Sequence, residues 1–151
     1  MKNANWLILL CMSLLILPYA MAQEATEEPD TIWQPVPGTS WQWQLMGDIN
    51  TSHDVEMYDI DLFDTPQSII DELHAEGRIV ICYFSAGTYE DWRADAGDFP
   101  EAVLGEGLDE WPGERWLDIR QLDILEPIMK ARLELAVEKA CDGVEPDNVD
   151  A

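Results

Sequence analysis

The segment Cys141–Asp150 carries four carboxylates in ten residues, CDGVEPDNVD. Its valines favour a β-strand, and the pair Asp142-Gly143 is typical of a turn that enters one. Residues two apart in a strand project from the same face, so Glu145 and Asp147 are predicted to share a face. Neighbouring carboxylates push a pKa upward, which suits acid–base chemistry, although a solvated acidic loop explains the same pattern.

Similar sets of polar residues occur three more times upstream, each at the end of a predicted strand. Any one of them could be a helix cap or a turn. In parallel α/β folds, however, ligands bind outside the carboxyl ends of the strands, so the four sets together predict one site. The upstream residues concerned are Asp59, Asp61, Ser85, Glu90, Arg93, Trp116, Asp118 and Arg120.

The types of these residues indicate a carbohydrate ligand. Carboxylates hydrogen-bond sugar hydroxyls, Trp and Tyr cover sugar rings, and hydrolysis of a glycosidic bond needs a pair of carboxyls. The sequence contains no nucleophilic Ser/His pair and no glycine-rich phosphate loop. No Cys/His cluster has zinc spacing, and the EF-hand pattern is missing, which leaves calcium a weak option. We therefore expect no cofactor and no metal.

The chain alternates between strand-like and helix-like segments. Strands are predicted at 41–45, 55–63, 78–86, 115–119 and 143–149. One helix is predicted to begin at Thr65-Pro66 and to stop at Gly77, and a second to span 123–140. Strands separated by helices favour βαβ units and a parallel sheet.

The second helix has the clearer apolar stripe. The residues assigned to its buried side are Leu125, Ile128, Met129, Leu133, Ala136, Val137 and Ala140. The residues assigned largely to its outer side are Lys130, Arg132, Glu134 and Lys139.

The N-terminus has the pattern of a signal peptide over residues 1–22. Lys2 is followed by an apolar run, Trp6–Leu17, and by Ala20-Met21-Ala22 as a cleavage site. This run is too short to span a bilayer comfortably. Residues 23–40 are acidic and then proline-rich, which predicts a disordered leader. We expect a secreted, extracellular or periplasmic protein with its folded domain at 41–151.

The predicted mature chain is strongly acidic. The sequence has 31 acids and 8 bases, of which only Lys2 falls in the signal peptide, so the net charge after cleavage is 7 − 31 = −24. Nucleic acids and anionic membranes need basic surfaces, so neither is expected as a partner. A cationic ligand, calcium or a salty environment fits this charge.

Two cysteines remain after cleavage, Cys82 and Cys141. In an oxidising compartment they could pair, but buried free cysteines are equally ordinary at such positions.

Five segments in order resemble the catalytic domain of glycoside hydrolase family 114. They are WQWQLMGDI, DVEMYDIDLFDT, VICYFSAGTYEDWR, ERWLDIR and CDGVEPDNVD, and they cover roughly residues 41–151. The resemblance implies a TIM-like (β/α)8 barrel and activity on α-1,4-linked galactosamine polymers, as in the endo-α-1,4-polygalactosaminidases. Such polymers are cationic when deacetylated, which would account for the acidic surface.

The resemblance also implies roles for individual residues. Asp147 falls on the catalytic aspartate of the family. Its partner carboxylate, a glutamate, lies on a later strand that this sequence does not contain. The positions implied to line the cleft are Asp61, Tyr83, Ser85, Gly87, Glu90, Arg93, Asp118, Arg120, Glu145 and Asp150.

The length of the chain bears on the completeness of the barrel. A TIM barrel typically needs about 250 residues, whereas 129 follow the predicted cleavage site. We therefore expect the N-terminal part of a longer enzyme, with about five of the eight strands, that is monomeric when complete. A naturally short five-stranded domain is the alternative. The functional alternatives are a non-catalytic carbohydrate- or cation-binding module and an acidic protein whose charge only keeps it soluble.

Overall fold

The computed structural model describes residues 32–149. The predicted signal peptide, the leader up to residue 31 and Asp150 lie outside the described residues. Residues 32–40 form no helix or strand. No helix within 32–149 is both long and apolar enough to cross a membrane.

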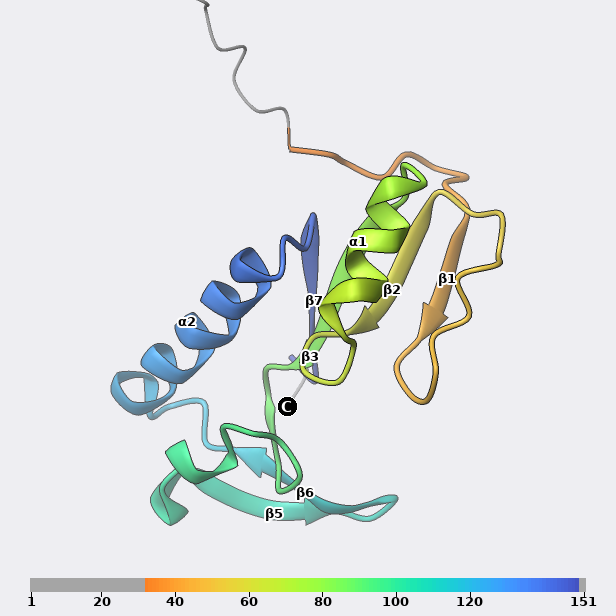
Figure 1. The fold of residues 1–151 in the computed structure, drawn as a ribbon. Coiled ribbons are helices and arrows are strands. Elements are labelled where there is room, and N and C mark those ends of the chain that lie inside the picture. The colour runs from red at the N-terminus through yellow and green to blue at the C-terminus, as the bar shows by residue number, and fades with distance from the viewer. Residues whose placement is uncertain (1–31, 150–151) are drawn as a thin grey trace, which may run out of the picture. The chain divides into compact units, whose positions relative to one another are not determined.

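Four parallel strands form the main sheet, in the order β1-β2-β3-β7 (Figure 1). They are β1 (Trp41–Gln44), β2 (Met57–Asp61), β3 (Ile79–Ser85) and β7 (Gly143–Asp147). All three neighbouring pairs are parallel. The predicted α/β class with parallel strands, similar to part of a TIM barrel, is thereby confirmed.

The predicted strand at 115–119 belongs to a different sheet. It is part of β6 (Trp111–Leu117), which pairs antiparallel with β4 (Thr88–Glu90) and β5 (Leu104–Leu108). The parallel sheet of the described residues therefore has four strands, one fewer than expected. The physical reason is local: β5 and β6 are separated by only two residues, and so short a connection can join antiparallel strands but not parallel ones.

Helix α1 (Gln67–Ala75) follows β2 and packs against β3 (Figure 1). Pro66, rather than the expected Thr65, occupies its N-cap position, and no side chain caps it. Gly77 ends the helix as predicted: its φ is 74°, and its N–H donates to the carbonyl of His74. Glycine adopts this left-handed conformation without the steric cost that a Cβ imposes.

Helix α2 (Leu122–Glu138) precedes β7, and its buried face differs from the predicted stripe. Arg132, expected outside, is 1% exposed, whereas Leu133 and Val137, expected inside, are 44% and 79% exposed. Arg132 can be buried because its guanidinium donates two hydrogen bonds to the carboxylate of Asp95, from Nε at 2.7 Å and from Nη2 at 3.0 Å. Satisfied hydrogen bonds make burial of a guanidinium possible.

The core lies between the helices and one face of the parallel sheet. Buried side chains of β2 and β3 alternate with those of the opposite face and pack against α1 and α2. The members of this cluster are Tyr58, Ile60, Leu62, Ile70, Leu73, Val80, Cys82, Phe84 and Ala136. Cys82 is disulfide-bonded to Cys141, which joins β3 to the turn before β7 and decides between the two alternatives left open by the sequence.

Candidate active site

Polar residues occupy the sheet face opposite the core. Strand alternation places Asp59 and Asp61 of β2, Tyr83 and Ser85 of β3, and Glu145 and Asp147 of β7 on this face. The register aligns Asp61 with Tyr83 and Tyr83 with Glu145. It also aligns Ser85 with Asp147 at the carboxyl ends of β3 and β7. The structure thus brings together residues from three of the predicted strand ends.

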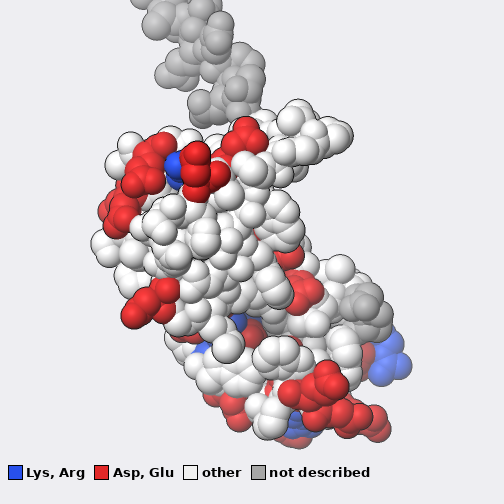
Figure 2. Space-filling view, turned by 90° about the vertical axis from the view of Figure 1, so that its right-hand side faces the viewer, with Lys and Arg blue, Asp and Glu red and all other residues white. Residues whose placement is uncertain are grey.

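A pocket of about 400 Å³ lies beyond these strand ends and contains Asp147 in its wall. Its lining includes five acids and one arginine, together with apolar and aromatic side chains from β4–β6 and nearby loops. The lining residues are Leu45, Met46, Asp61, Asp64, Tyr83, Glu90, Trp92, Arg93, Leu108, Trp111, Glu114, Asp147 and Asn148. On the face shown in Figure 2, Asp and Glu side chains likewise form several clusters and Lys and Arg are few.

Asp147 presents a largely free carboxylate to the pocket. It is the last residue of β7 and is exposed. The hydroxyl of Tyr83 donates a hydrogen bond to its Oδ2 at 3.2 Å. Burial, and then the negative charges of Asp147 and Glu90, raise the pKa of Tyr83 above its usual range. Tyr83 therefore remains a hydrogen-bond donor to Asp147 at any physiological pH.

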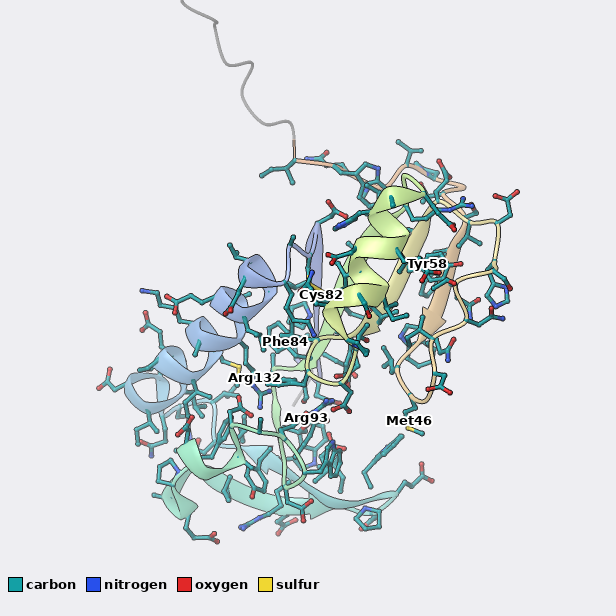
Figure 3. All side chains as sticks on the ribbon, in the orientation of Figure 1. Met46, Tyr58, Cys82, Phe84, Arg93 and Arg132 are labelled. Carbon is teal, nitrogen blue, oxygen red and sulfur yellow. A yellow bond between two sulfur atoms is a disulfide. The ribbon has the colours of Figure 1, made fainter. Side chains whose placement is uncertain are left out.

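Arg93 neutralises two other acids of the pocket. Its guanidinium donates to Asp61 from Nη1 at 2.8 Å and to Glu90 from Nε at 2.8 Å and Nη2 at 2.9 Å. All three side chains are buried. Burial alone would lower the pKa of Arg93, but its hydrogen bonds to Glu90 and Asp61 raise it above the ordinary value. Figure 3 shows Arg93 and Arg132 between the parallel sheet and the antiparallel sheet.

A buried cluster of hydroxyl, amide and carboxylate groups connects the two sheets behind Asp147. Ser85 and Thr88 are hydrogen-bonded to each other, and the Thr88 hydroxyl donates to Glu114 of β6. The side-chain amide of Asn148 donates to Ser85 Oγ at 3.0 Å. Ser85, predicted to line the cleft, thus lies behind the pocket wall, and Arg132 Nη1 donates to its carbonyl.

Asp59 and Glu145 form a second pair of acids, two residues before Asp61 and Asp147 on the same strands. Burial, followed by a hydrogen bond to Glu145 and the charges of Glu145 and Asp147, raises the pKa of Asp59 to about 8. Asp59 Oδ1 and Glu145 Oε2 are buried and have no hydrogen-bond donor among the described residues. A proton held between the two carboxyls would satisfy both oxygens.

Asp118 and Arg120, also predicted for the site, do not line this pocket. They follow β6 of the antiparallel sheet and line a separate hollow with Leu104 and Leu117. They bind each other, with Arg120 Nε 2.7 Å from Asp118 Oδ1, and this contact lowers the pKa of Asp118 to about 2. Gly87, by contrast, lies beside the site: a Cβ at this position would be 1.7 Å from the carbonyl oxygen of Asn148.

The sequence interpretation omitted three polar residues that belong to this site: Asp64, Glu114 and Asn148. Asp59 was predicted for the site together with Asp61, because residues two apart in a strand share a face. Glu114 directly precedes the strand that was predicted to begin at Arg115, so its parity was not considered. Asn148 directly follows Asp147. Across residues 32–149, no cluster of three or more His, Cys, Asp or Glu side chains is arranged to hold a metal ion.

Comparison with known proteins assigns the family. Residues 22–151 match the model of the glycoside-hydrolase family GH114. This chain belongs to family GH114. The GH114 chain is 54% identical to Ega3 of Aspergillus fumigatus, whose crystal structure was solved in complex with galactosamine. The TM-score is 0.75, and the match covers 78% of this chain and 47% of the Ega3 chain.

A more distant structural match of this chain is to the glycoside hydrolase domain of PelA from Pseudomonas aeruginosa. At 13% identity and a TM-score of 0.56, over 74% of this chain and 44% of PelA's, it concerns the fold alone. The GH114 chain therefore spans about half the length of these solved structures. The comparison with curated proteins gives no match.

Proposed function

We propose that this chain forms part of a glycosidase that hydrolyses α-1,4-galactosaminidic linkages by a two-carboxylate mechanism, with Asp147 as one of the two carboxylates. Support comes from family membership and from the similarity to Ega3, which was solved with galactosamine. The observation that carries the proposal is the exposed carboxylate of Asp147 in an acidic, tryptophan-lined pocket at the carboxyl ends of parallel strands.

Asp147 is the pocket acid most available for chemistry. Asp61 and Glu90 are held by Arg93, and Glu114 accepts hydrogen bonds within the buried cluster. Asp64 is exposed, but its Oδ2 lies 3.6 Å from Nη1 of Arg93, so its charge is partly neutralised. A free carboxylate can act as a nucleophile or stabilise the positive charge of an oxocarbenium-like transition state. In the family that this chain resembles, the partner carboxylate is a glutamate on a later strand.

The remaining pocket residues suit an amino sugar. Trp92 and Trp111 are 49% and 55% exposed, so their faces are free to stack on a sugar ring. The excess of acids attracts the protonated amines of a galactosamine polymer and strengthens the electrostatic contribution to binding.

The test is hydrolysis of polygalactosamine by the full-length protein and its Asp147→Asn variant. This nearly isosteric change removes the charge, which should cost on the order of several kcal/mol of transition-state stabilisation and thus orders of magnitude in rate. Binding of galactosamine oligomers should persist. Glu145→Gln, which alters a neighbouring acid, should cause a smaller loss. Near wild-type turnover of Asp147→Asn would show that the catalytic assignment is wrong.

The alternative function is a non-catalytic module that binds carbohydrate or cations in the same pocket. Under this alternative, the wild-type protein binds galactosamine oligomers without cleaving them. Asp147→Asn and Glu145→Gln then weaken this binding to a similar degree. Calorimetric titration together with a reducing-end assay distinguishes the two functions.

We also propose that the protein is exported and begins at Gln23 after cleavage. The apolar N-terminal run and its small-residue site motivate this proposal. The Cys82–Cys141 disulfide supports it, because such bonds persist in oxidising compartments. Mass spectrometry of the secreted protein should give a Gln23 terminus; an intact Met1 would contradict this.

A further inference from the structure

We propose that Glu114 is a positioning residue for Asp147 and acts through the side-chain amide of Asn148. The proposal rests on the proposed function, in which Asp147 is a catalytic carboxylate. Glu114 belongs to the antiparallel sheet, and Asp147 belongs to the parallel sheet. The buried cluster between the sheets connects Glu114 to the residue that follows Asp147, so a change at Glu114 can move Asp147.

The direction of the Asp147 side chain depends mainly on its backbone. Tyr83 supplies the one hydrogen bond to its carboxylate from the described residues. The main chain is held more firmly, since the Asp147 carbonyl accepts from the N–H of Ala86 at 2.8 Å and of Gly87 at 3.2 Å. The next residue, Asn148, has a φ of 58°, a left-handed conformation that is uncommon outside glycine. Whatever holds Asn148 in this conformation therefore also directs Asp147.

The side chain of Asn148 is anchored in the buried cluster. Its Nδ2 lies 3.0 Å from Ser85 Oγ, 3.3 Å from Thr88 Oγ1 and 3.4 Å from Glu114 Oε1. Ser85 and Thr88 are fully buried, and Glu114 is 7% exposed. All three acceptors are thus in places where water competes little for the amide.

Glu114 fixes the direction of every hydrogen bond in this cluster. A carboxylate can only accept, so the Thr88 hydroxyl must donate to Glu114. With its proton committed, Thr88 Oγ1 accepts from the Ser85 hydroxyl, and Ser85 Oγ in turn accepts from Asn148. The carboxylate at the end of the chain therefore determines that the amide nitrogen of Asn148, and not its oxygen, faces the cluster.

The negative charge is the unusual feature of this cluster. Among residues 32–149, Glu114 forms no ion pair with a Lys, Arg or His. Burying a carboxylate is costly even when hydrogen bonds partly compensate, and a neutral glutamine of the same shape would cost less. A glutamine, however, can present either its oxygen or its amide group, so it would not order the cluster in one direction.

The experiment compares Glu114→Gln with Glu106→Gln, the same substitution at an exposed position of the same antiparallel sheet. Thr88→Val breaks the link between Glu114 and Ser85 without changing the carboxylate. The first readout is nuclear magnetic resonance of the Asn148 side-chain amide in the full-length protein. The second is the kcat and KM of the full-length enzyme on polygalactosamine.

Positioning predicts that Glu114→Gln shifts the Asn148 amide resonances and speeds their hydrogen exchange by about tenfold. It also predicts a kcat lowered by about 10²-fold, as small misplacements of reacting groups can cause, with KM changed by less than about threefold. Thr88→Val should have similar effects, and the double variant should be no worse than either single one. Glu106→Gln should change none of these quantities.

Three results would overturn the proposal. One is an Asn148 amide that is unchanged in Glu114→Gln. Another is additive loss of kcat in the double variant. The third is a raised KM with an unchanged kcat, which would make Glu114 a sugar-binding residue. If Glu114→Gln does not fold, Thr88→Val decides between the same results. If wild-type protein cleaves no polygalactosamine, the proposed function fails, but the amide resonances still decide whether Glu114 positions Asn148.

Discussion

Asp59 of β2 and Glu145 of β7 lie on either side of strand β3, on the face of the sheet opposite its core, and each has a buried carboxyl oxygen without a hydrogen-bond donor among the described residues. The strands β2 and β7 are not neighbours in the sheet, so only the side chains of these two acids can approach each other, above β3. The two carboxyls can coexist there if they share one proton, because two adjacent buried negative charges would repel strongly.

The shared proton predicts a specific pH dependence of stability. The folded state keeps the Asp59 proton up to about pH 8, whereas the unfolded chain releases it near the ordinary value of 3.8. The stabilisation is therefore complete below pH 3.8 and is lost as pH rises toward 8, by at most about 1.4 kcal/mol per pH unit. Asp59→Asn should remove this loss, so its advantage over wild type should grow with pH.

Urea denaturation of both proteins between pH 4 and pH 8 measures this effect. Asp48→Asn, at an exposed position, serves as the control and should follow the wild-type pH dependence. Parallel curves for Asp59→Asn and wild type would mean that Asp59 holds no proton in the folded state.

Removal of the Trp111 side chain should weaken sugar binding. An exposed aromatic face in contact with a cationic sugar contributes on the order of 1 kcal/mol, or roughly fivefold in Kd. Calorimetric titration of Trp111→Ala with galactosamine oligomers measures the loss. Trp41→Ala is a matched control, since Trp41 is similarly exposed, at 54% against 55%, and does not line the pocket. Equal losses in both variants would argue against stacking on Trp111.

Gly87→Ala should both destabilise the fold and impair the site. The added methyl group would collide with the Asn148 carbonyl and force the end of β7 away from β3. Overpacking of this kind typically costs about 1–3 kcal/mol. Gly97→Ala is the control, because an added Cβ there meets no atom within 4 Å. Chemical denaturation and oligomer titration should therefore show a lower free energy of unfolding and weaker binding for Gly87→Ala than for Gly97→Ala. Equal values in the two variants would mean that the end of β7 moves aside at little energetic cost.

Replacement of Cys82 and Cys141 by alanine should lower the free energy of unfolding. The disulfide closes a loop with a sequence separation of 59, and the chain-entropy argument assigns such a loop about 4 kcal/mol. Urea denaturation of the double variant, and of the wild type with and without a reductant, measures the difference. No change on reduction would indicate that the disulfide does not form.

The sequence predicted the parallel strands best, because the apolar run of β3 and the acids ending β2 and β7 are local signals. It could not predict the partner of β6, since Gly105 and Gly107 in β5 and Gly113 in the first half of β6 make this segment look like a loop. Helical spacing placed Arg132 outside, because periodicity does not detect a guanidinium buried by Asp95 and the carbonyl of Ser85. Tertiary pairing, not local preference, decided both cases.

The sequence predicted the part of the candidate site that follows from which residues of a strand share a face. Asp61, Tyr83, Glu90, Arg93 and Asp147 were all assigned to the cleft, and all line the pocket. Asp118 and Arg120 were assigned from the family resemblance and from a strand expected in the parallel sheet; β6 belongs to the other sheet, and neither residue lines this pocket. Glu114 reaches the site through the same unexpected sheet.

The β5–β6 hairpin supplies Leu108 and Trp111 to the pocket, yet neither strand pairs with the parallel sheet. Its turn, Asp109-Glu110, is exposed and joins only these two strands. Insertions in that turn would lengthen one wall of the pocket without moving the strand that carries Asp147. Evolution could thereby alter how many sugar units an enzyme of this kind accommodates while its catalytic strand stays the same.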